Sequence, residues 1–211
     1  IVYSLFPTVL LSNQEILTTN TFSSGFNSDN FQQDIIYSLI IDIDGSVNLN
    51  SYEGSGYIID IQNRPGRVGF PEVIESKIGN PRLVKFREIE TDRLLQVKGW
   101  DLKLGNQTFW NLYVMSFGSN INLNNLNLIN TEIIGTGDIN MGKNLNSGDI
   151  FISGNFNIYV DTSLPIVVIG SAEVPAGWID ATIGYLNQTN ENYKFKVIVE
   201  EGSNVVFQNG E

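Results

Sequence analysis

Short apolar runs, separated by turn residues every eight to twelve positions from Asp34 onward, constrain this chain more than any other feature. Apolar and polar residues alternate within many runs, as in a strand with one buried face. The clearest is 192–200, where every second residue from Tyr193 to Val199 is aromatic or valine. This spacing predicts an all-β sandwich of the Ig-like or jelly-roll type. Strands are expected near 34–43, 46–50, 55–62, 82–90, 93–99, 107–117, 120–134, 148–160, 164–174, 178–186 and 192–200.

One short helix is expected near 71–78. Pro71 and Glu72 suit a first helical turn, Lys77 the last turn, and Gly79 the position just after it. Such a helix would cover an open end of the sandwich. Elsewhere the local signals are turns, with a hairpin predicted at Asp44-Gly45.

Residues 119–130 alternate aliphatic side chains with Asn, and the alternation slips at Asn124-Asn125. The slip predicts a β-bulge, and the Asn residues suit a polar outer sheet surface. Related fragments at 47–50 and 144–146 leave a β-solenoid as the alternative fold, although no fixed period of 20 to 50 residues emerges.

Composition excludes several classes of function. The 211 residues include no Cys and no His, which removes disulfides, thiolate or imidazole metal sites and the Ser-His-Asp triad. A formal net charge of −11 with 12 scattered basic residues argues against nucleic acid. We therefore expect a protein that is not an enzyme and needs no cofactor. Low charge and abundant Asn, Ser and Thr favour a secreted surface protein.

The first eleven residues form an apolar strand with no obvious place in the rest of the sequence. Every second residue lies on one face and none of them is polar: Ile1, Tyr3, Leu5, Pro7, Val9 and Leu11. The run is too short to span a membrane, and no basic residue precedes Arg64 to mark a signal peptide, so a mature terminus is expected. Pro7 suits an edge or inserted strand, because it lacks a backbone donor. The run is the chain's own first strand or a strand donated to another molecule.

A small, polar segment separates this strand from the rest of the chain. Residues 13–33 are rich in Ser, Asn and Thr and are expected to act as a flexible tether. About twenty extended residues span up to roughly 70 Å, enough to reach a neighbouring subunit. The predicted organisation is a donor strand at 1–12, the tether at 13–33 and one sandwich domain at 34–211.

Three patterns could carry metal or catalytic chemistry. Asp42, Asp44 and Glu53 match ligand positions of a calcium loop, but the turn glycine is misplaced, so they are weak metal candidates beside a hairpin. Gly54-Ser55-Gly56 lacks the lysine of a phosphate loop and is interpreted as a turn. Glu88 and Glu90 share a strand face, as a glycosidase pair could, but nothing marks a cleft.

Aromatic residues and sequons could mark a glycan-related surface. The three tryptophans either line a sugar-binding face or belong to the core, and the core is favoured: Trp100, Trp110 and Trp178. Asn106 and Asn187 begin Asn-X-Thr sequons and are candidates for N-glycosylation.

The apolar first strand, polar tether and Asn-rich, Cys-free acidic β domain together resemble archaeal donor-strand filament subunits, most closely the thread pilins of Sulfolobales. The resemblance implies a homopolymer of identical subunits joined head to tail, covalent N-glycans and a cell-surface filament for adhesion or biofilm formation. It assigns the inserted face to Ile1, Tyr3, Leu5, Val9 and Leu11. The alternative is a monomeric secreted carbohydrate-binding or S-layer-associated module, in which 1–11 is the domain's own strand.

Overall fold

The computed structural model describes residues 18–23, 35–63, 72–76, 78–87, 99–142, 144–170, 178–181, 184–187 and 193–209. Every regular element within these ranges is a strand, which confirms the all-β class. The strands are β1 (Thr18–Ser23), β2 (Ile36–Asp42), β3 (Val47–Tyr52), β4 (Tyr57–Asn63), β5 (Glu72–Glu75), β6 (Arg82–Arg87), β7 (Gly99–Gly105), β8 (Phe109–Asn122), β9 (Asn127–Met141), β10 (Ile150–Asp161), β11 (Ile166–Ile169), β12 (Trp178–Ala181), β13 (Gly184–Asn187), β14 (Phe195–Val199) and β15 (Asn204–Gln208). No described helix is long and apolar enough to cross a membrane.

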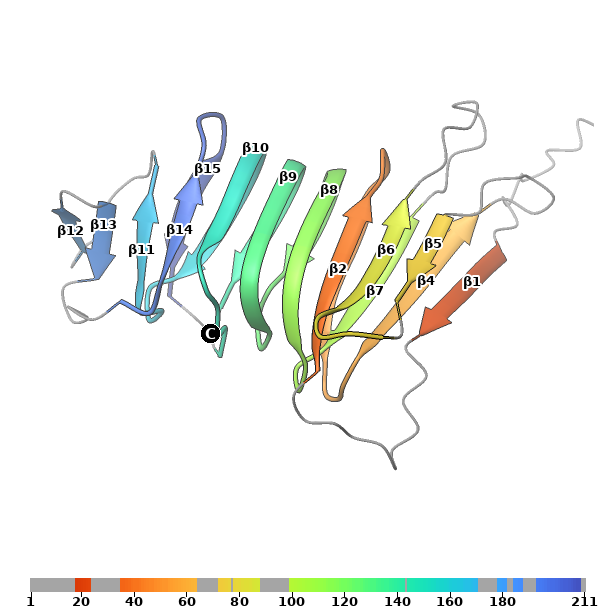
Figure 1. Cartoon of the computed structure of the whole chain (residues 1–211). Helices are drawn as coiled ribbons and strands as arrows, with labels where there is room; N and C mark the ends of the chain where they lie inside the picture. Colours follow the sequence, from red (N-terminus) through yellow and green to blue (C-terminus); the bar gives the residue numbers. More distant parts are fainter. Residues whose placement is uncertain are drawn as a thin grey trace, which may run out of the picture.

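The centre of the molecule is a stack of coils that run parallel to one another. Each of the long strands β8, β9 and β10 bends near its middle, so that its two halves pair in two different sheets (Figure 1). Val114 pairs with Ile133, and Ile133 pairs with Ile152, which places successive coils 19 residues apart. Shorter strand pairs form equivalent coils on both sides: β6 with β7, β2 with β3, and β14 with β15.

Two sheets result, and they face each other across one core. Sheet I consists of β5, β6, β2, the first halves of β8, β9 and β10, then β14, β11, β13 and β12. Sheet II consists of β1, β4, β7, β3, the second halves of β8, β9 and β10, then β15. The parallel coils end in antiparallel strands on both sides, β4 and β1 at one end and β13 and β12 at the other.

In each strand, every second side chain points into the space between the two sheets and fills it. In sheet I one inward row crosses six strands and consists of Phe86, Ile41, Val114, Ile133, Ile152 and Val199. In sheet II the matching row consists of Ile59, Leu102, Leu49, Ile121, Ile139, Ile158 and Val205. All these side chains are buried. Stacking like residues coil on coil removes their apolar surface from water, which is the main stabilising term.

The bends that join the sheets depend on small residues. In β8 the Ser116 and Ser119 hydroxyl oxygens lie 2.7 Å apart, and Ser119 Oγ also accepts a 3.0 Å hydrogen bond from the backbone N–H of Val47. The neighbouring coil places Gly135 and Gly137 opposite these serines, both with positive φ. Adjacent backbones approach too closely here for any side chain on β9.

At the other end of each coil, asparagines stack from turn to turn. Asn125 and Asn144 both have a positive φ, near 60°, and Asn144 Nδ2 donates to Asn125 Oδ1 at 3.1 Å. Asn146 Nδ2 donates to Asn127 Oδ1 at 3.3 Å in the same way. The predicted β-bulge at Asn124-Asn125 is therefore wrong, because these residues form the turn between β8 and β9. Asn suits this turn because it adopts left-handed backbone conformations more readily than most residues.

The pairing corrects two further expectations about topology. Ig-like and jelly-roll sandwiches are built from antiparallel pairs, whereas the two sheets here are joined by parallel coils, as in the solenoid alternative. Asp44-Gly45 is not a hairpin. It lies at the bend between β2 and β3, where Phe117 N–H donates to the Gly45 carbonyl at 3.1 Å. The two flanking strands both pair with β8, in different sheets.

The expected helix near 71–78 is also wrong, because Glu72–Glu75 is strand β5. It pairs antiparallel with β6, which places Glu72 opposite Arg87 and Ile74 opposite Lys85. Partners of opposite charge and the β-branched Val73 and Ile74 favour this edge position over a helix. Pairing with a neighbouring strand therefore outweighs the local capping signals of the sequence.

Part of the expected tether is structured. Thr18–Ser23 forms β1, an antiparallel partner of β4. Its Phe22 packs against the core, with its ring 5.8 Å from that of Phe86 in an edge-to-face arrangement. The β-branched threonines and this one aromatic anchor explain why the segment joins sheet II. The other tether residues, 13–17 and 24–33, lie outside the described residues.

Candidate functional site

Several predicted site residues lie outside the described part of the chain. These are the donor-strand residues Ile1, Tyr3, Leu5, Val9 and Leu11, together with Glu88 and Glu90. Trp178 and Asn187 belong to described strands, but their side chains are not described. The donor strand and the Asn187 sequon therefore stay predictions.

The two described tryptophans are core residues. Trp100 is 1% exposed and Trp110 is fully buried, so neither can stack on a sugar at the surface. Trp110 donates its indole N–H to the Gly105 carbonyl at 3.1 Å, and Trp100 packs against Phe86 with ring centroids 6.1 Å apart. The interpretation of these two as core residues is confirmed.

The weak metal candidates are not brought together. Asp42 ends β2 and Asp44 lies in the bend that follows, whereas Glu53 comes after the far end of β3. Six strand residues separate the bend from Glu53, which is roughly 20 Å at about 3.3 Å per residue. Among the described residues no group of three or more acidic side chains is arranged to hold a metal ion.

The Asn106 sequon is built into a turn. Asn106 is half-buried, and its Oδ1 accepts a 3.3 Å hydrogen bond from the backbone N–H of Gly54. The sequon's Thr108 is only 5% exposed, and its hydroxyl oxygen accepts from Gly56 N–H at 2.8 Å. A glycan on Asn106 would be attached to Nδ2, the side-chain atom that takes no part in the hydrogen bond with Gly54.

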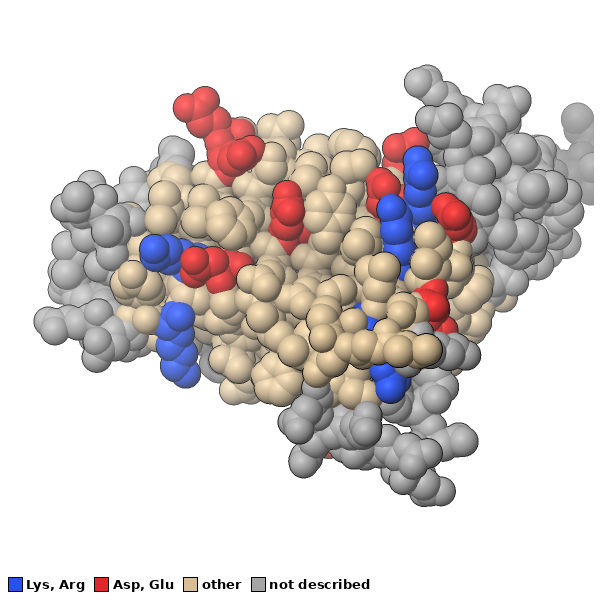
Figure 2. Space-filling model, in the orientation of Figure 1, with Lys and Arg blue, Asp and Glu red and all other residues tan. Residues whose placement is uncertain are grey.

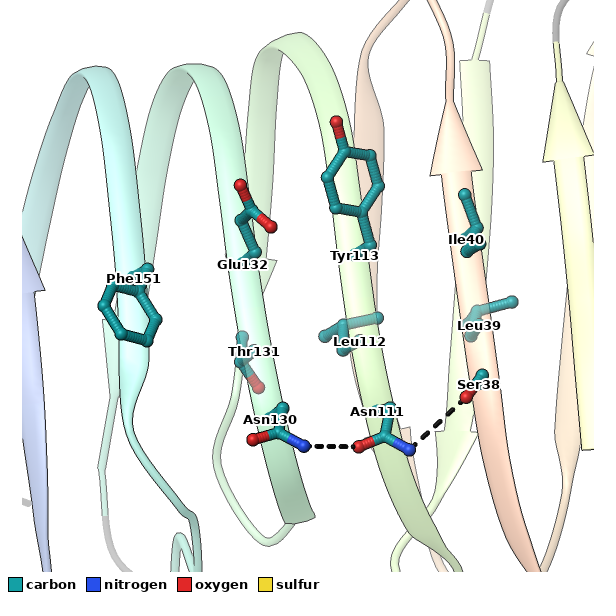
Figure 3. A pocket seen from close by; sticks show the side chains of 10 residues that line it. All are labelled: Ser38, Leu39, Ile40, Asn111, Leu112, Tyr113, Asn130, Thr131, Glu132 and Phe151. Atoms are coloured by element: carbon teal, nitrogen blue, oxygen red, sulfur yellow. Dashed lines mark hydrogen bonds between the residues drawn. The ribbon is translucent and has the colours of Figure 1, made fainter. Parts of the chain in front are cut away.

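A groove on the outer face of sheet I is a candidate binding site formed by described residues. It has a volume of about 380 Å³ and crosses four neighbouring strands, β2, β8, β9 and β10 (Figure 3). We call it the sheet I groove, lined by Ser38, Leu39, Ile40, Asn111, Leu112, Tyr113, Asn130, Thr131, Glu132 and Phe151. Its volume is in the range of sites that hold small molecules.

The upper row of the groove places two aromatic rings on either side of one carboxylate. Tyr113, Glu132 and Phe151 are register partners on β8, β9 and β10, and all three project from the outer face (Figure 3). Neighbouring strands lie about 4.8 Å apart, so the two aromatic residues are separated by roughly 10 Å along the row. Phe151 is 49% exposed, which is unusual for a phenylalanine in a central strand.

The lower row of the groove is a chain of amide and hydroxyl groups. Asn130 Nδ2 donates to Asn111 Oδ1 at 3.0 Å, and Asn111 Nδ2 donates to Ser38 Oγ at 3.3 Å (Figure 3). These bonds hold the side chains in fixed orientations and still leave further donor and acceptor positions open to a ligand. The groove thus has an aromatic row and a parallel polar row.

The groove continues toward β14, where Ile198 is the register partner of Phe151. A second hollow of about 280 Å³ shares Glu132 and Phe151 and adds Ile152, Ser153, Ile198 and Glu200. Ser153 donates its hydroxyl to the Glu200 carboxylate at 2.5 Å, which fixes that carboxylate at the groove's end. An extended ligand could therefore follow the row across five strands.

The electrostatics of the groove are acidic. Burial raises the pKa of the Tyr113 hydroxyl, and the negative charges of Glu132 and Asp42 raise it further, so the phenol stays protonated and able to donate. Within the described part of the chain, neither hollow is lined by Lys or Arg. Figure 2 shows the same face: among the described residues, basic side chains gather toward its two ends and none stands in its middle.

Tyr113 and Phe151 were not among the residues expected to stack on sugars, which were the three tryptophans. The sequence carried one signal for the site. Phe151 lies between Ile150 and Ile152 in a predicted strand, and because successive side chains point to opposite faces, Phe151 points outward if the two isoleucines are buried. The alignment of Phe151 with Tyr113 required the 19-residue coil spacing, which the sequence did not reveal.

Comparison with known proteins shows the fold. No family model matches the sequence, and no curated protein matches it. The structure is similar to that of a candidate cell adhesion protein from Clostridium sporogenes, with a TM-score of 0.61 and 13% identity over 92% of this chain and 97% of that chain. Candidate adhesins from Parabacteroides distasonis and Parabacteroides merdae give TM-scores of 0.39 and 0.41 at 12% and 15% identity, covering 70% and 77% of this chain and 58% and 63% of theirs.

Proposed function

We propose that this chain is an extracellular adhesion module that binds a glycan along the sheet I groove. The observation that carries the proposal is the pair of outward aromatic residues, Tyr113 and Phe151, aligned beside the amide row of Asn111 and Asn130. The name of the Clostridium protein with the same fold supports an adhesive role. A binding role also suits a chain without His or Cys.

The two rows match the two kinds of surface on a sugar. The C–H faces of pyranose rings pack on aromatic rings, whereas ring hydroxyls exchange hydrogen bonds with amides and carboxylates. Because the groove is an open surface on a rigid sheet, little order has to be gained when a ligand binds. An extended oligosaccharide fits this shape better than a compact metabolite.

The test uses a matched pair of phenylalanines. Phe151→Ala should lower the affinity of the full chain for its glycan by about tenfold or more, the size of one lost aromatic contact. Phe117→Ala is the control, since Phe117 is 48% exposed but lies at the bend of β8, away from the groove. Binding is measured on immobilised oligosaccharides that include neutral and amine-bearing chains. Equal loss in both variants, or binding of no glycan, would overturn the proposal.

A donor-strand filament is the second candidate, favoured by an open edge. Among the described residues β15, the last strand of sheet II, pairs only with β10, and its outward Val206 is 37% exposed. Such an edge can accept a strand from another copy by backbone hydrogen bonding. In this proposal the donated strand is 1–11, and the product is a head-to-tail surface polymer that serves adhesion or biofilm formation.

Removal of 1–11 tests the filament directly. The truncated chain should stay monomeric when the intact chain forms fibres, as seen by electron microscopy and size-exclusion chromatography. Intact chains that remain monomeric, with 1–11 protected from proteases, would instead favour the single module. Fibres from the truncated chain would exclude donation by this strand.

A further inference from the structure

The sheet I groove carries two carboxylates for which a neutral ligand has no opposite charge. Glu132 is exposed at the middle of the aromatic row, and the second acidic group of the groove, Glu200, lies at its β14 end. The residues that the structure describes around both hollows include no basic side chain. A neutral sugar over Glu132 could offer its hydroxyl groups to the carboxylate but no opposite charge, so a cationic group would be the stronger partner.

The arrangement of the row suits a cation. Tyr113 on β8 and Phe151 on β10 flank Glu132 on β9, so a positive group above the carboxylate would also lie beside two aromatic rings (Figure 3). Aromatic faces attract ammonium groups, and a carboxylate accepts charge-assisted hydrogen bonds from them. The same three side chains can therefore recognise a protonated amine.

We propose that the groove selects a glycan with free amino groups, with one protonated amine seated at Glu132 between Tyr113 and Phe151. This inference rests on the proposed glycan-binding function and names its substrate class. The pyranose rings on either side of that amine pack on the two aromatic residues. The hydroxyl groups of the ligand face the amide row of Asn111 and Asn130.

Two oligosaccharides that differ only in whether their amino groups are free or acetylated distinguish the contribution of the amine from that of the rest of the sugar. The probes are the hexamer of β-1,4-linked glucosamine and its fully N-acetylated counterpart, titrated into the full chain at mildly acidic pH. The free-amine hexamer should bind roughly tenfold more tightly, the contribution expected of one charge-assisted hydrogen bond. Its affinity should also fall with added salt, because the contact is ionic and partly exposed to solvent.

A charge-removing variant assigns the preference to one residue. Glu132→Gln keeps the size of the side chain and should bring the ratio of the two dissociation constants close to one. Glu53→Gln removes the same charge at an exposed position beyond β3 and should keep the tenfold ratio. Thermal unfolding of both variants checks that each is folded.

The outcomes distinguish the inference from the function on which it rests. Equal affinity for the two hexamers, or a ratio that survives Glu132→Gln, overturns the amine site. If acetylated or other neutral oligosaccharides still bind in a Phe151-dependent manner, the glycan-binding function stands. If no oligosaccharide binds, both the function and the inference fail.

Discussion

Gly135 of β9 lies directly against the backbone of Ser116 in β8, so that a Cβ placed on Gly135 would be 1.7 Å from the Ser116 carbonyl oxygen. The two residues are register partners at the bend that joins the sheets. Gly135 also has a φ of +132°, a region that side chains rarely adopt. We expect Gly135→Ala to destabilise the fold by about 3 kcal/mol or more, because backbone strain and overpacking act together.

Gly99 provides the control for this substitution. It lies at the start of β7, and a Cβ there would meet no atom within 4 Å. Gly99→Ala should change the unfolding free energy by less than about 1 kcal/mol. Both variants are compared by urea unfolding. If Gly135→Ala were as stable as Gly99→Ala, close backbone contact between the coils could not be what the bend requires.

A buried hydroxyl in sheet I predicts a stabilising substitution. Thr131 is 2% exposed and lies between Leu112 and Ile150 in an inward row, and its Oγ1 has no hydrogen-bond partner among the described residues. Valine has the same shape without the polar atom. Thr131→Val should therefore raise the unfolding free energy by about 1 kcal/mol, the lower end of the penalty for an unsatisfied buried group.

Thr108 predicts the opposite sign for the same change. It is also buried, but its hydroxyl oxygen accepts a 2.8 Å hydrogen bond from Gly56 N–H. Thr108→Val should lower the unfolding free energy by about 1 to 2 kcal/mol, because the Gly56 donor would lose its partner. Chemical denaturation of both variants measures the two changes in unfolding free energy. If the two changes had the same sign, the hydrogen bond of Thr108 would not be what distinguishes the two threonines.

Adjacent isoleucines in β9 test the inward row. Ile133 is buried between Val114 and Ile152, whereas Ile134 is half-buried on the other face of the same strand. Ile133→Ala should cost about 2 to 5 kcal/mol through lost burial and a cavity. Ile134→Ala should cost clearly less. Equal losses in thermal unfolding would mean that the register of β9 is shifted by one residue.

The strands could be predicted from the sequence because their period-2 alternation is local. The runs near 34–43 and 148–160 correspond to β2 and β10. The pairing could not be predicted, because register depends on contacts between coils. Alternating Asn and aliphatic residues at 119–130 belong to two successive strands, and only stacking at 19 residues shows where one ends.

The candidate site illustrates the same limit. Asn111, Asn130 and Ser38 are far apart in the sequence and form one row only because three parallel strands place them side by side. Composition correctly favoured the core for Trp100 and Trp110, since large aromatic residues on apolar strands are mostly buried. It could not show that Phe151 and Tyr113 project together from the opposite face.

Tyr57 predicts how the fold responds to alkaline pH. It is 3% exposed and packs edge-to-face on Tyr37 and Phe86, with ring centroids 6.4 Å and 6.1 Å away. Burial strongly raises the pKa of its hydroxyl above the ordinary value of 10.0, and the negative charge of Glu75 adds to this. The folded-state pKa therefore lies above that of the unfolded chain, where the phenol ionises more readily.

The sign of the effect follows from this difference. The contribution of a neutral Tyr57 is fully present below about pH 10 and is lost as the pH rises above it, because the unfolded state then releases a proton that the folded state keeps. The loss is at most about 1.4 kcal/mol per pH unit for this one group. Tyr57→Phe has no proton to release, so its unfolding free energy should fall less steeply above pH 10 than that of the unaltered chain. Parallel curves for the two proteins, measured by urea unfolding at a series of alkaline pH values, would show that Tyr57 ionises equally in both states.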